Sequence, residues 1–178
     1  MEKKFELTGN FVINAFGIKL FQIKCTKSFK YANEGDLGGY VEKEDNLSQY
    51  GDAWVSGDAQ VSGDARVYGD AQVYGNARVY GDAQVSGDAR VSGNAQVYGD
   101  ARVENDHMHC GFDCFGSCNR HTHAYKTKGN KVEITCGCFR GSLEEFEKKV
   151  EETHKGTIYE KQYKAIINLI KIKFGIDG

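Results

Sequence analysis

Cysteine and histidine residues crowd one short segment of this 178-residue chain. Between positions 107 and 123 the sequence reads HMHCGFDCFGSCNRHTH, which supplies three thiols and four imidazoles, and two more cysteines follow at 136 and 138. Thiolate and imidazole are the ligands that zinc prefers, usually in tetrahedral sets of four. The candidate zinc ligands are therefore Cys110, Cys114, Cys118, His121, His123, Cys136 and Cys138.

The spacing of these cysteines favours a different interpretation. They follow the patterns C-x3-C-x3-C and C-x-C, whereas zinc ribbons and fingers pair their ligands as C-x2-C. Cys136 and Cys138 lie two positions apart on an expected strand, so both side chains point to the same face. A buried free cysteine is an ordinary small core residue. We therefore predict reduced cysteines and no cofactor, and we retain a zinc site and a redox-reactive cysteine as alternatives.

The sequence carries no other constellation that is typical of catalysis. It has no P-loop, no G-x-S-x-G motif and no pair of carboxylates in an apolar setting. His154 is expected at the end of a helix, where a solvated imidazole interacts favourably with the helix dipole. We therefore predict that the protein is not an enzyme.

The elements that must position these side chains are dominated by a repeat. Nine hexapeptides of the form Tyr/Ser-Gly-Asp/Asn-Ala-x-Val run without interruption from Tyr50 to Val103. A short fixed period is typical of a solenoid. Ala and Val flank the x position, so both point inward on a short strand, and Gly-Asp or Gly-Asn supplies the corner. The pattern predicts a mainly β fold, a parallel β-helix with three hexads per coil and about three coils.

The outward side chains of such a helix stack in columns 18 residues apart. This register places Tyr80 next to Tyr98 and Tyr50 next to Tyr68. Tyrosine ladders either stabilise a sheet surface or bind a partner. The repeat has four Arg against seven Asp, which argues against nucleic acid as that partner. The candidate binding surface consists of Trp54, Tyr50, Tyr68, Tyr74, Tyr80, Tyr98, Arg66, Arg78, Arg90 and Arg102.

Two other segments flank the repeat. Residues 1–49 are expected to form an N-terminal β cap, because a β-helix exposes unpaired backbone at each end. Residues 104–178 are expected to form a small α+β module with a hairpin and two helices. Alternating residues on either side of Lys128-Gly129-Asn130 predict the hairpin. Ser142 with Glu145 forms a capping box that opens the first helix.

Several of these segments resemble known families. The hexads resemble the left-handed hexapeptide β-helix family, which includes trimeric acyltransferases. The stretch GDLGGYVE at 35–42, followed by NLS at 46–48 and by GDA-x-V repeats, resembles phage and prophage hexapeptide-repeat proteins described as polymer-forming. The stretch CGCFRGSLEEF at 136–146 resembles a module attached to such proteins. The resemblance implies a left-handed coil and a phage origin, and it does not extend to the upstream Cys/His run.

Composition and resemblance together lead to an expected function. The chain has 22 Gly, no Pro and a formal net charge of −2, and no stretch is typical of a signal peptide or a membrane span. We expect residence in the cytoplasm, that of the host cell for a phage protein. The expected function is binding to a host protein or protein complex as a host-directed or counter-defence inhibitor, such as an anti-CRISPR or signal-sequestering protein.

Alternatives are a self-assembling structural protein and a hexapeptide acyltransferase with a histidine as general base. The second helix has more apolar residues than the two expected strands can cover. We therefore expect a homodimer that forms through the C-terminal module.

Overall fold

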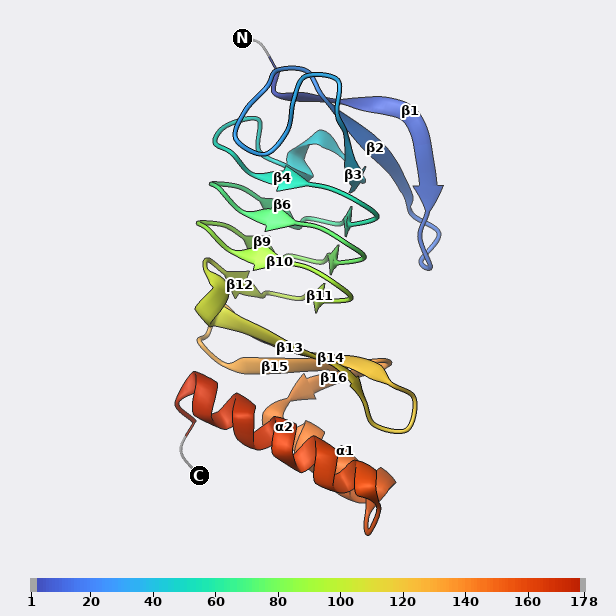
Figure 1. The fold of residues 1–178 in the computed structure, drawn as a ribbon, viewed down its shortest axis with the longest axis vertical. Coiled ribbons are helices and arrows are strands. Elements are labelled where there is room, and N and C mark those ends of the chain that lie inside the picture. Colours follow the sequence, from blue (N-terminus) through green and yellow to red (C-terminus); the bar gives the residue numbers. More distant parts are fainter. Residues whose placement is uncertain (1–2, 177–178) are drawn as a thin grey trace. The chain divides into compact units, whose positions relative to one another are not determined.

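The computed structural model describes residues 3–176, and the chain divides into two compact units, Met1–Asp106 and His107–Gly178. The first unit contains the repeat, and the second contains the Cys/His segment and both α-helices (Figure 1). Within the described residues, no helix combines the length and the apolar character that crossing a membrane requires.

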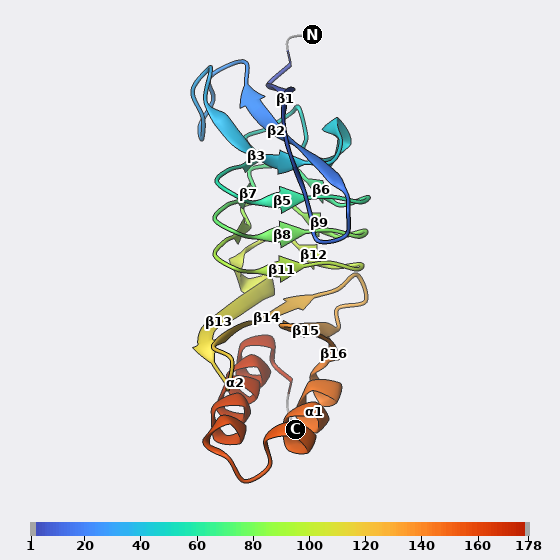
Figure 2. The ribbon, with the colours of Figure 1, turned by 90° about the vertical axis from the view of Figure 1, so that its right-hand side faces the viewer.

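The repeat forms nine strands, each made of the x and Val residues of one hexad. Strands one coil apart pair in parallel, for example Gln60 with Arg78 and Val61 with Val79. They form three columns, in the orders β4-β7-β10, β5-β8-β11 and β6-β9-β12 (Figure 2). The strands are β4 (Trp54–Val55), β5 (Gln60–Val61), β6 (Arg66–Val67), β7 (Gln72–Val73), β8 (Arg78–Val79), β9 (Gln84–Val85), β10 (Arg90–Val91), β11 (Gln96–Val97) and β12 (Arg102–Val103).

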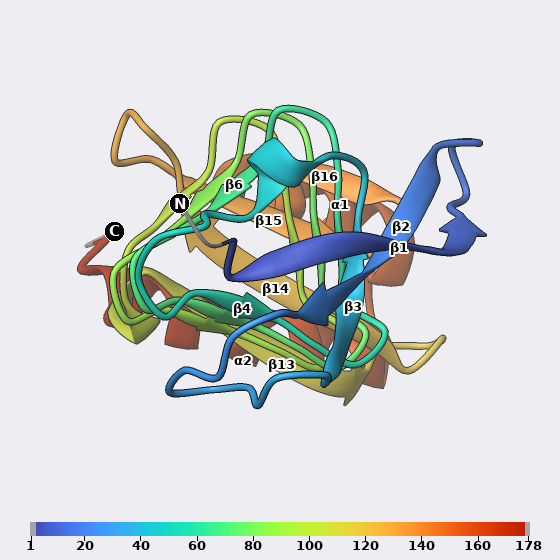
Figure 3. The ribbon, with the colours of Figure 1, turned by 90° about the horizontal axis from the view of Figure 1, so that it is seen from above.

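The interior of the solenoid is built from Val and Ala, as the alternation predicts. The nine hexad valines are fully buried, and the nine hexad alanines are buried as well. The corners depend on glycine: Gly63 has a φ of +69°, and a Cβ there would lie 3.1 Å from the backbone nitrogen of Gly81 in the next coil. Because every corner stacks closely on the next, the coils superimpose when viewed along the axis (Figure 3).

The solenoid has about four turns, one more than the nine hexads supply. Strand β3 (Leu37–Val41) pairs in parallel with β5, and Leu47 forms an isolated parallel bridge to Val67. The short 3-10 helix η1 (Glu44–Asn46) lies between these two positions. Val41 and Leu47 are six positions apart, as in the repeat, but each lies 20 rather than 18 positions before its partner. Their segments also lack the Gly-Asp/Asn-Ala signature, so the nine predicted hexads do not include this turn. The left-handed sense of the coil stays a prediction.

An antiparallel hairpin of β1 (Phe5–Ile13) and β2 (Lys19–Cys25) continues the sheet that β3 begins, in the order β1-β2-β3-β5-β8-β11. Both strands fall within residues 1–49, the segment for which an N-terminal β cap was expected. The hairpin has a β-bulge between Leu7 and Phe11.

Two buried side chains satisfy backbone carbonyls at the start of the solenoid. Inside the repeat such carbonyls accept from the coil above, as Gly69 O does from Ala53 N at 2.8 Å. In the first hexads the Lys4 ammonium donates to the carbonyls of residues 51 and 53, at 3.1 and 2.8 Å. The Asn46 amide donates to those of residues 63 and 65, at 3.0 and 2.9 Å. Burial lowers the pKa of Lys4 to about 8, against the opposing effect of the nearby Asp52.

The second unit is a four-stranded antiparallel sheet with two helices packed on one face. Its strands are β13 (His109–Phe115), β14 (Arg120–Lys126), β15 (Val132–Cys136) and β16 (Phe139–Ser142), and the 3-10 helix η2 (Asp106–Met108) precedes them. The expected hairpin is confirmed as β14 and β15. Residues 109–115, which include Cys110 and Cys114, add a further strand by pairing with β14.

Helices α1 (Leu143–His154) and α2 (Ile158–Phe174) both begin at side-chain caps. The Ser142 hydroxyl accepts from the backbone N–H of Glu145, and the Glu145 carboxylate accepts from that of Ser142, which confirms the capping box. Both helices turn apolar residues toward the sheet. The core consists of Ala124, Val132, Ile134, Cys136, Leu143, Phe146, Val150, Tyr163, Ile166, Ile167 and Ile170.

Candidate functional site

One predicted surface residue of the solenoid is in fact buried. Trp54 occupies an x position, which should point outward, yet only 4% of it is exposed. The ring of Phe29, from the segment after β2, packs edge-on against it with centroids 5.4 Å apart. The expectation that Trp54 belongs to an exposed binding surface is therefore wrong, since the N-terminal segment covers it.

The tyrosine columns follow the predicted register. The rings of Tyr80 and Tyr98 stack with centroids 4.8 Å apart and planes 8° apart, and Phe16 lies 5.9 Å from Tyr80. Tyr50 and Tyr68 line one groove of about 570 Å³. Tyr74 is exposed on another face, in the column of β7.

The arginines of the repeat do not gather on one surface. Arg66 and Arg102 lie in the β6-β9-β12 column, whereas Arg78 and Arg90 lie in the other two. The guanidinium of Arg102 donates to the backbone carbonyls of Asp82 and Ala101, at 3.0 and 2.8 Å. The predicted binding residues are therefore distributed over three faces of the solenoid, and Arg102 forms hydrogen bonds to the backbone of the coil.

The predicted zinc ligands are divided between the two faces of the C-terminal sheet. Cys136 belongs to the core beneath the helices, and Cys110 packs against that core. Because strand neighbours alternate and Ala124 faces the helices, His121 and His123 point to the opposite face. The remaining candidates, Cys114, Cys118 and Cys138, are exposed. Across residues 3–176, no group of three or more His, Cys, Asp or Glu side chains has an arrangement that could hold a metal ion.

The histidines of the sheet form a hydrogen-bonded network. His109 Nδ1 lies 3.0 Å from His123 Nε2, and His121 Nδ1 lies 2.7 Å from a carboxylate oxygen of Asp113. Gly111 leaves room for these rings, because a Cβ there would lie 2.6 Å from the His121 ring. These contacts lie on the sheet face opposite the helices, where His123 is buried.

The two cysteines on the helix side of the sheet, Cys110 and Cys136, are half-buried and buried, respectively. Burial raises the pKa of the Cys110 thiol to about 11, which disfavours the nucleophilic thiolate. The Cys136 sulfur accepts from the Thr122 hydroxyl at 3.3 Å and lies 3.7 Å from the Tyr163 hydroxyl. Burial, followed by the hydrogen bond to Cys136, raises the pKa of Tyr163 well above its usual value.

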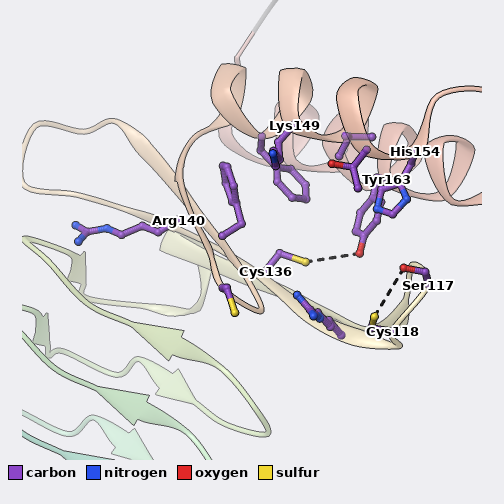
Figure 4. A pocket seen from close by; sticks show the side chains of 13 residues that line it. Ser117, Cys118, Cys136, Arg140, Lys149, His154 and Tyr163 are labelled. Atoms are coloured by element: carbon purple, nitrogen blue, oxygen red, sulfur yellow. Dashed lines mark hydrogen bonds between the residues drawn. The ribbon is translucent and has the colours of Figure 1, made fainter. Parts of the chain in front are cut away.

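Cys136 and Tyr163 also form the floor of a pocket in the C-terminal unit. The pocket has a volume of about 570 Å³ and is bounded by α1, by Tyr163 of α2 and by the two turns that precede β14 and β16 (Figure 4). Aromatic and aliphatic side chains form its wall, and polar or cationic side chains surround its opening. The lining residues are Ser117, Cys118, Arg120, Cys136, Cys138, Phe139, Arg140, Phe146, Lys149, Val150, Thr153, His154 and Tyr163.

Positive charge dominates the lining. None of the described lining residues is Asp or Glu. The Arg120 side chain lies across Gly137, a turn residue with a φ of +60°, where a Cβ would collide with the guanidinium arm. Lys149 pairs with Glu152 at 3.5 Å on the surface of α1. The imidazole of His154 stacks on the Tyr163 ring, with centroids 5.4 Å apart.

Arg140 does not contribute its charge to the pocket. Its guanidinium forms an ion pair with Glu133 at 3.2 Å, and Figure 4 shows the side chain directed away from Cys136 and Tyr163. Arg120 and Lys149, the latter also in an exposed ion pair with Glu152, are therefore the cationic groups available to a ligand.

The candidate site residues predicted from the sequence did not include Phe146, Tyr163, Arg120 or Lys149. These residues come from three separate elements, β14, α1 and α2, so no local motif connects them. The available signal was the pair of glycine turns, GSCNR and CGCF, since Gly116 and Gly137 both have positive φ. Each turn lets a strand reverse tightly beside the pocket.

Comparison with known families concerns the first unit alone. Four consecutive stretches, residues 59–72, 71–83, 83–96 and 95–107, match the family model of the YdcK β-solenoid repeat. No curated protein matches the chain significantly. The matched stretches cover the solenoid from β5 onward, and they agree with its strands and corners. This chain is therefore a β-solenoid repeat protein, similar over those residues to the YdcK repeat.

Proposed function

We propose that this protein acts by binding, and that the pocket of its C-terminal unit holds a small organic anion with an apolar body. The observation that carries the proposal is the lining itself: an apolar wall, cationic groups at the opening, and no carboxylate among the described lining residues. Its volume of about 570 Å³ lies within the range of roughly 300–1,000 Å³ that is usual for ligand pockets.

Each part of the lining has a distinct role in this proposal. Phe139, Phe146 and Val150 would cover the apolar body of the ligand and remove it from water. The Arg120 guanidinium offers planar paired donors that suit carboxylate or phosphate oxygens. Lys149 adds a second positive charge. The Tyr163 hydroxyl keeps its proton at neutral pH, because burial raises its pKa, so it remains a neutral polar group at the floor.

Catalysis is not part of the proposal. The thiol of Cys136 and the hydroxyl of Tyr163 lie within hydrogen-bonding distance of each other, and a carboxylate base is missing from the described lining. Among the inhibitors expected from the sequence, one that sequesters a small anionic signal is the form that a pocket of this kind favours. The phage origin and the host-directed role are supported by the sequence resemblance alone.

The proposal is tested by calorimetric titration of the full chain at low ionic strength. Two series of ligands distinguish the sources of such an anion: nucleoside monophosphates against the parent nucleosides, and aromatic or medium-chain carboxylates against their amides. We expect at least one anion to bind and its neutral counterpart to bind about tenfold more weakly or not at all, because charge-assisted hydrogen bonds contribute roughly 1.5–3 kcal/mol.

Arg120→Gln should reduce the affinity for that anion about tenfold or more, and Lys149→Gln should reduce it by less. Lys128→Gln is the matched control, since it removes the same charge from the turn between β14 and β15, outside the pocket lining. Equal affinity for the anion and its neutral counterpart contradicts the proposal. So does an affinity that Arg120→Gln leaves unchanged, or the absence of binding in both series.

A further inference from the structure

Helix α2 is apolar on two faces. Tyr163, Ile166, Ile167 and Ile170 are buried inside the C-terminal unit. A second set remains exposed: Ile158 by 61%, Leu169 by 51% and Ile172 by 69%, with Ala165 exposed between them. These four residues, which we call the α2 stripe, follow the spacing i, i+7, i+11, i+14. That spacing places them along one side of a helix, as in the seam of a coiled coil.

The neighbouring helix α1 presents charges of alternating sign. Its residues Glu145, Lys148 and Glu152, and Lys155 at its C-terminal cap, are exposed. Their spacing of three, four and three residues places them on the side opposite the buried Leu143, Phe146 and Val150. We call these four residues the α1 row. Ion pairs with Glu147 and Glu151 join α2 to α1 through Lys171 and Lys164, at 2.9 and 3.6 Å, so the stripe and the row belong to one two-helix layer.

We propose that this two-helix layer is the interface with a second copy of the chain, related by a two-fold axis perpendicular to both helices. In that arrangement α2 lies antiparallel on α2 of the other copy, and α1 on α1. With Ala165 near the axis, Ile158 of one copy faces Ile172 of the other. On α1, Glu145 faces Lys155 and Lys148 faces Glu152, so every facing pair in the row has opposite charges.

The pattern of charges indicates that the partner at this interface is a second copy of the chain. The row carries two positive and two negative charges, so a partner of a single charge sign would gain from half of them and lose from the other half. An antiparallel copy matches all four, and it places apolar on apolar along the stripe. A two-fold axis parallel to the helices would instead lay the charged row on the apolar stripe. The small Ala165 side chain permits close approach of the two helices at the centre.

Apart from the exposed ion pair between Lys149 and Glu152, this inference is separate from the ligand pocket. It concerns the outer side of the helix layer, whereas Phe146, Val150 and Tyr163 face the pocket from the inner side. A dimer was expected from the sequence through this module, and the stripe and the row now identify its surface and its symmetry.

The first test measures the mass of the full chain by sedimentation equilibrium over a range of concentrations. We expect a discrete dimer. Ile172→Lys should weaken dimerisation by 100-fold or more, because two copies of a charge would enter the seam. Ile13→Lys is the matched control, since Ile13 is 65% exposed on the β1–β2 hairpin of the other unit. A monomer at all concentrations overturns the inference, as does an open-ended polymer or a dimer that Ile172→Lys leaves intact.

The second test concerns symmetry. Lys148→Glu and Glu152→Lys should each weaken the dimer about tenfold. Each change places like charges opposite one another, and it does so twice, once in each of the two symmetry-related contacts between the copies. The double variant Lys148→Glu/Glu152→Lys restores opposite charges and should restore the dimer. Both single variants should retain their helical circular dichroism, since neither residue is buried. If the double variant is weaker than either single one, the antiparallel arrangement is wrong.

Discussion

The two units of this protein bury their apolar residues in opposite ways. The solenoid repeats one small environment, in which Val and Ala fill each coil and the closing glycines stack on one another. The C-terminal unit packs aromatic and aliphatic residues of different sizes between one sheet face and two helices. Identical small residues fill the solenoid interior. In the C-terminal unit, side chains of different sizes leave a pocket beside Phe146 and Tyr163.

This difference is consistent with different roles for the two units. A stack of identical coils is stabilised by contacts between neighbours, so it forms a regular scaffold whose outward residues are spread over three faces. A site that converges on one ligand needs side chains from several directions. In the C-terminal unit two turns and two helices supply them, and the pocket lies there.

The largest effect is expected from a charge inside the solenoid. Val79→Asp places an unpaired carboxylate at a fully buried position, which should cost on the order of 5 kcal/mol or more. Thermal unfolding followed by the fluorescence of Trp54, the single tryptophan, reports on this unit. Arg78→Asp is the control, because this neighbour in the same strand is exposed and should change stability by less than about 1 kcal/mol. Equal melting of the two variants would show that the assigned register is wrong.

A slightly smaller loss is expected in the C-terminal unit. Phe146→Ala removes a buried ring that contacts the rings of Phe139 and Tyr163, with centroids 5.1 and 5.6 Å apart. We expect a loss of about 4 kcal/mol, detected as a lower melting temperature of the helical circular dichroism signal. Phe115→Ala, at an exposed position of β13, should cost much less. The comparison between the units fails if Phe146→Ala lowers the Trp54 transition by the same amount.

An intermediate effect is expected at the first turn of the solenoid. Asn46→Ala would leave the carbonyls of residues 63 and 65 without their donor, at a cost of about 2 kcal/mol. Denaturant unfolding monitored by Trp54 fluorescence measures it. Asn10→Ala is the control, because the Asn10 amide bonds Gln22 on the exposed hairpin at 3.4 Å. A loss no greater than that of the control would show that the side-chain cap contributes little.

The smallest effect is a difference between the two units in how their stability changes with pH under alkaline conditions. Lys4 has a pKa of about 8 in the folded chain against 10.5 ordinarily, so the unfolded chain binds more protons and stability of the first unit rises between pH 8 and 10.5. The pKa of Cys110 is raised from 9.0 to about 11, so here the folded chain binds more protons. The stability that this thiol contributes below pH 9 is lost as the pH rises toward 11, and Tyr163 adds to the loss at still higher pH.

Denaturation midpoints read at pH 8, 9 and 10 by Trp54 fluorescence and by helical circular dichroism should therefore move in opposite directions. Cys110→Ser should flatten the decline of the second signal and leave the first unchanged. If both midpoints move in the same direction, Lys4 and Cys110 do not control the pH dependence of their two units in the way proposed.

Local patterns were sufficient for much of the fold. The hexad alternation predicted the inward Val and Ala, and the column spacing predicted the Tyr80–Tyr98 stack. The capping box at Ser142 and the apolar stripes predicted both helices. Each of these features follows from a pattern within one repeat or one helix, or from the constant 18-residue period of the coil. The additional solenoid turn was missed because the residues around Val41 and Leu47 lack the Gly-Asp/Asn-Ala signature and pair with the coil 20 rather than 18 positions on.

The sequence by itself determined the repeat, its interior and the types of the flanking elements, because period and capping act over a few neighbouring residues. Tertiary structure alone decided that Phe29 covers Trp54, that the cysteines and histidines point to opposite faces of a sheet, and that Arg120 and Lys149 open onto one pocket. These outcomes depend on residues from different elements: Phe29 and Trp54 are 25 positions apart in the chain, and Arg120 and Lys149 are 29 apart. Such contacts are determined by how sheets and helices pack, for which a single sequence carries no local signal.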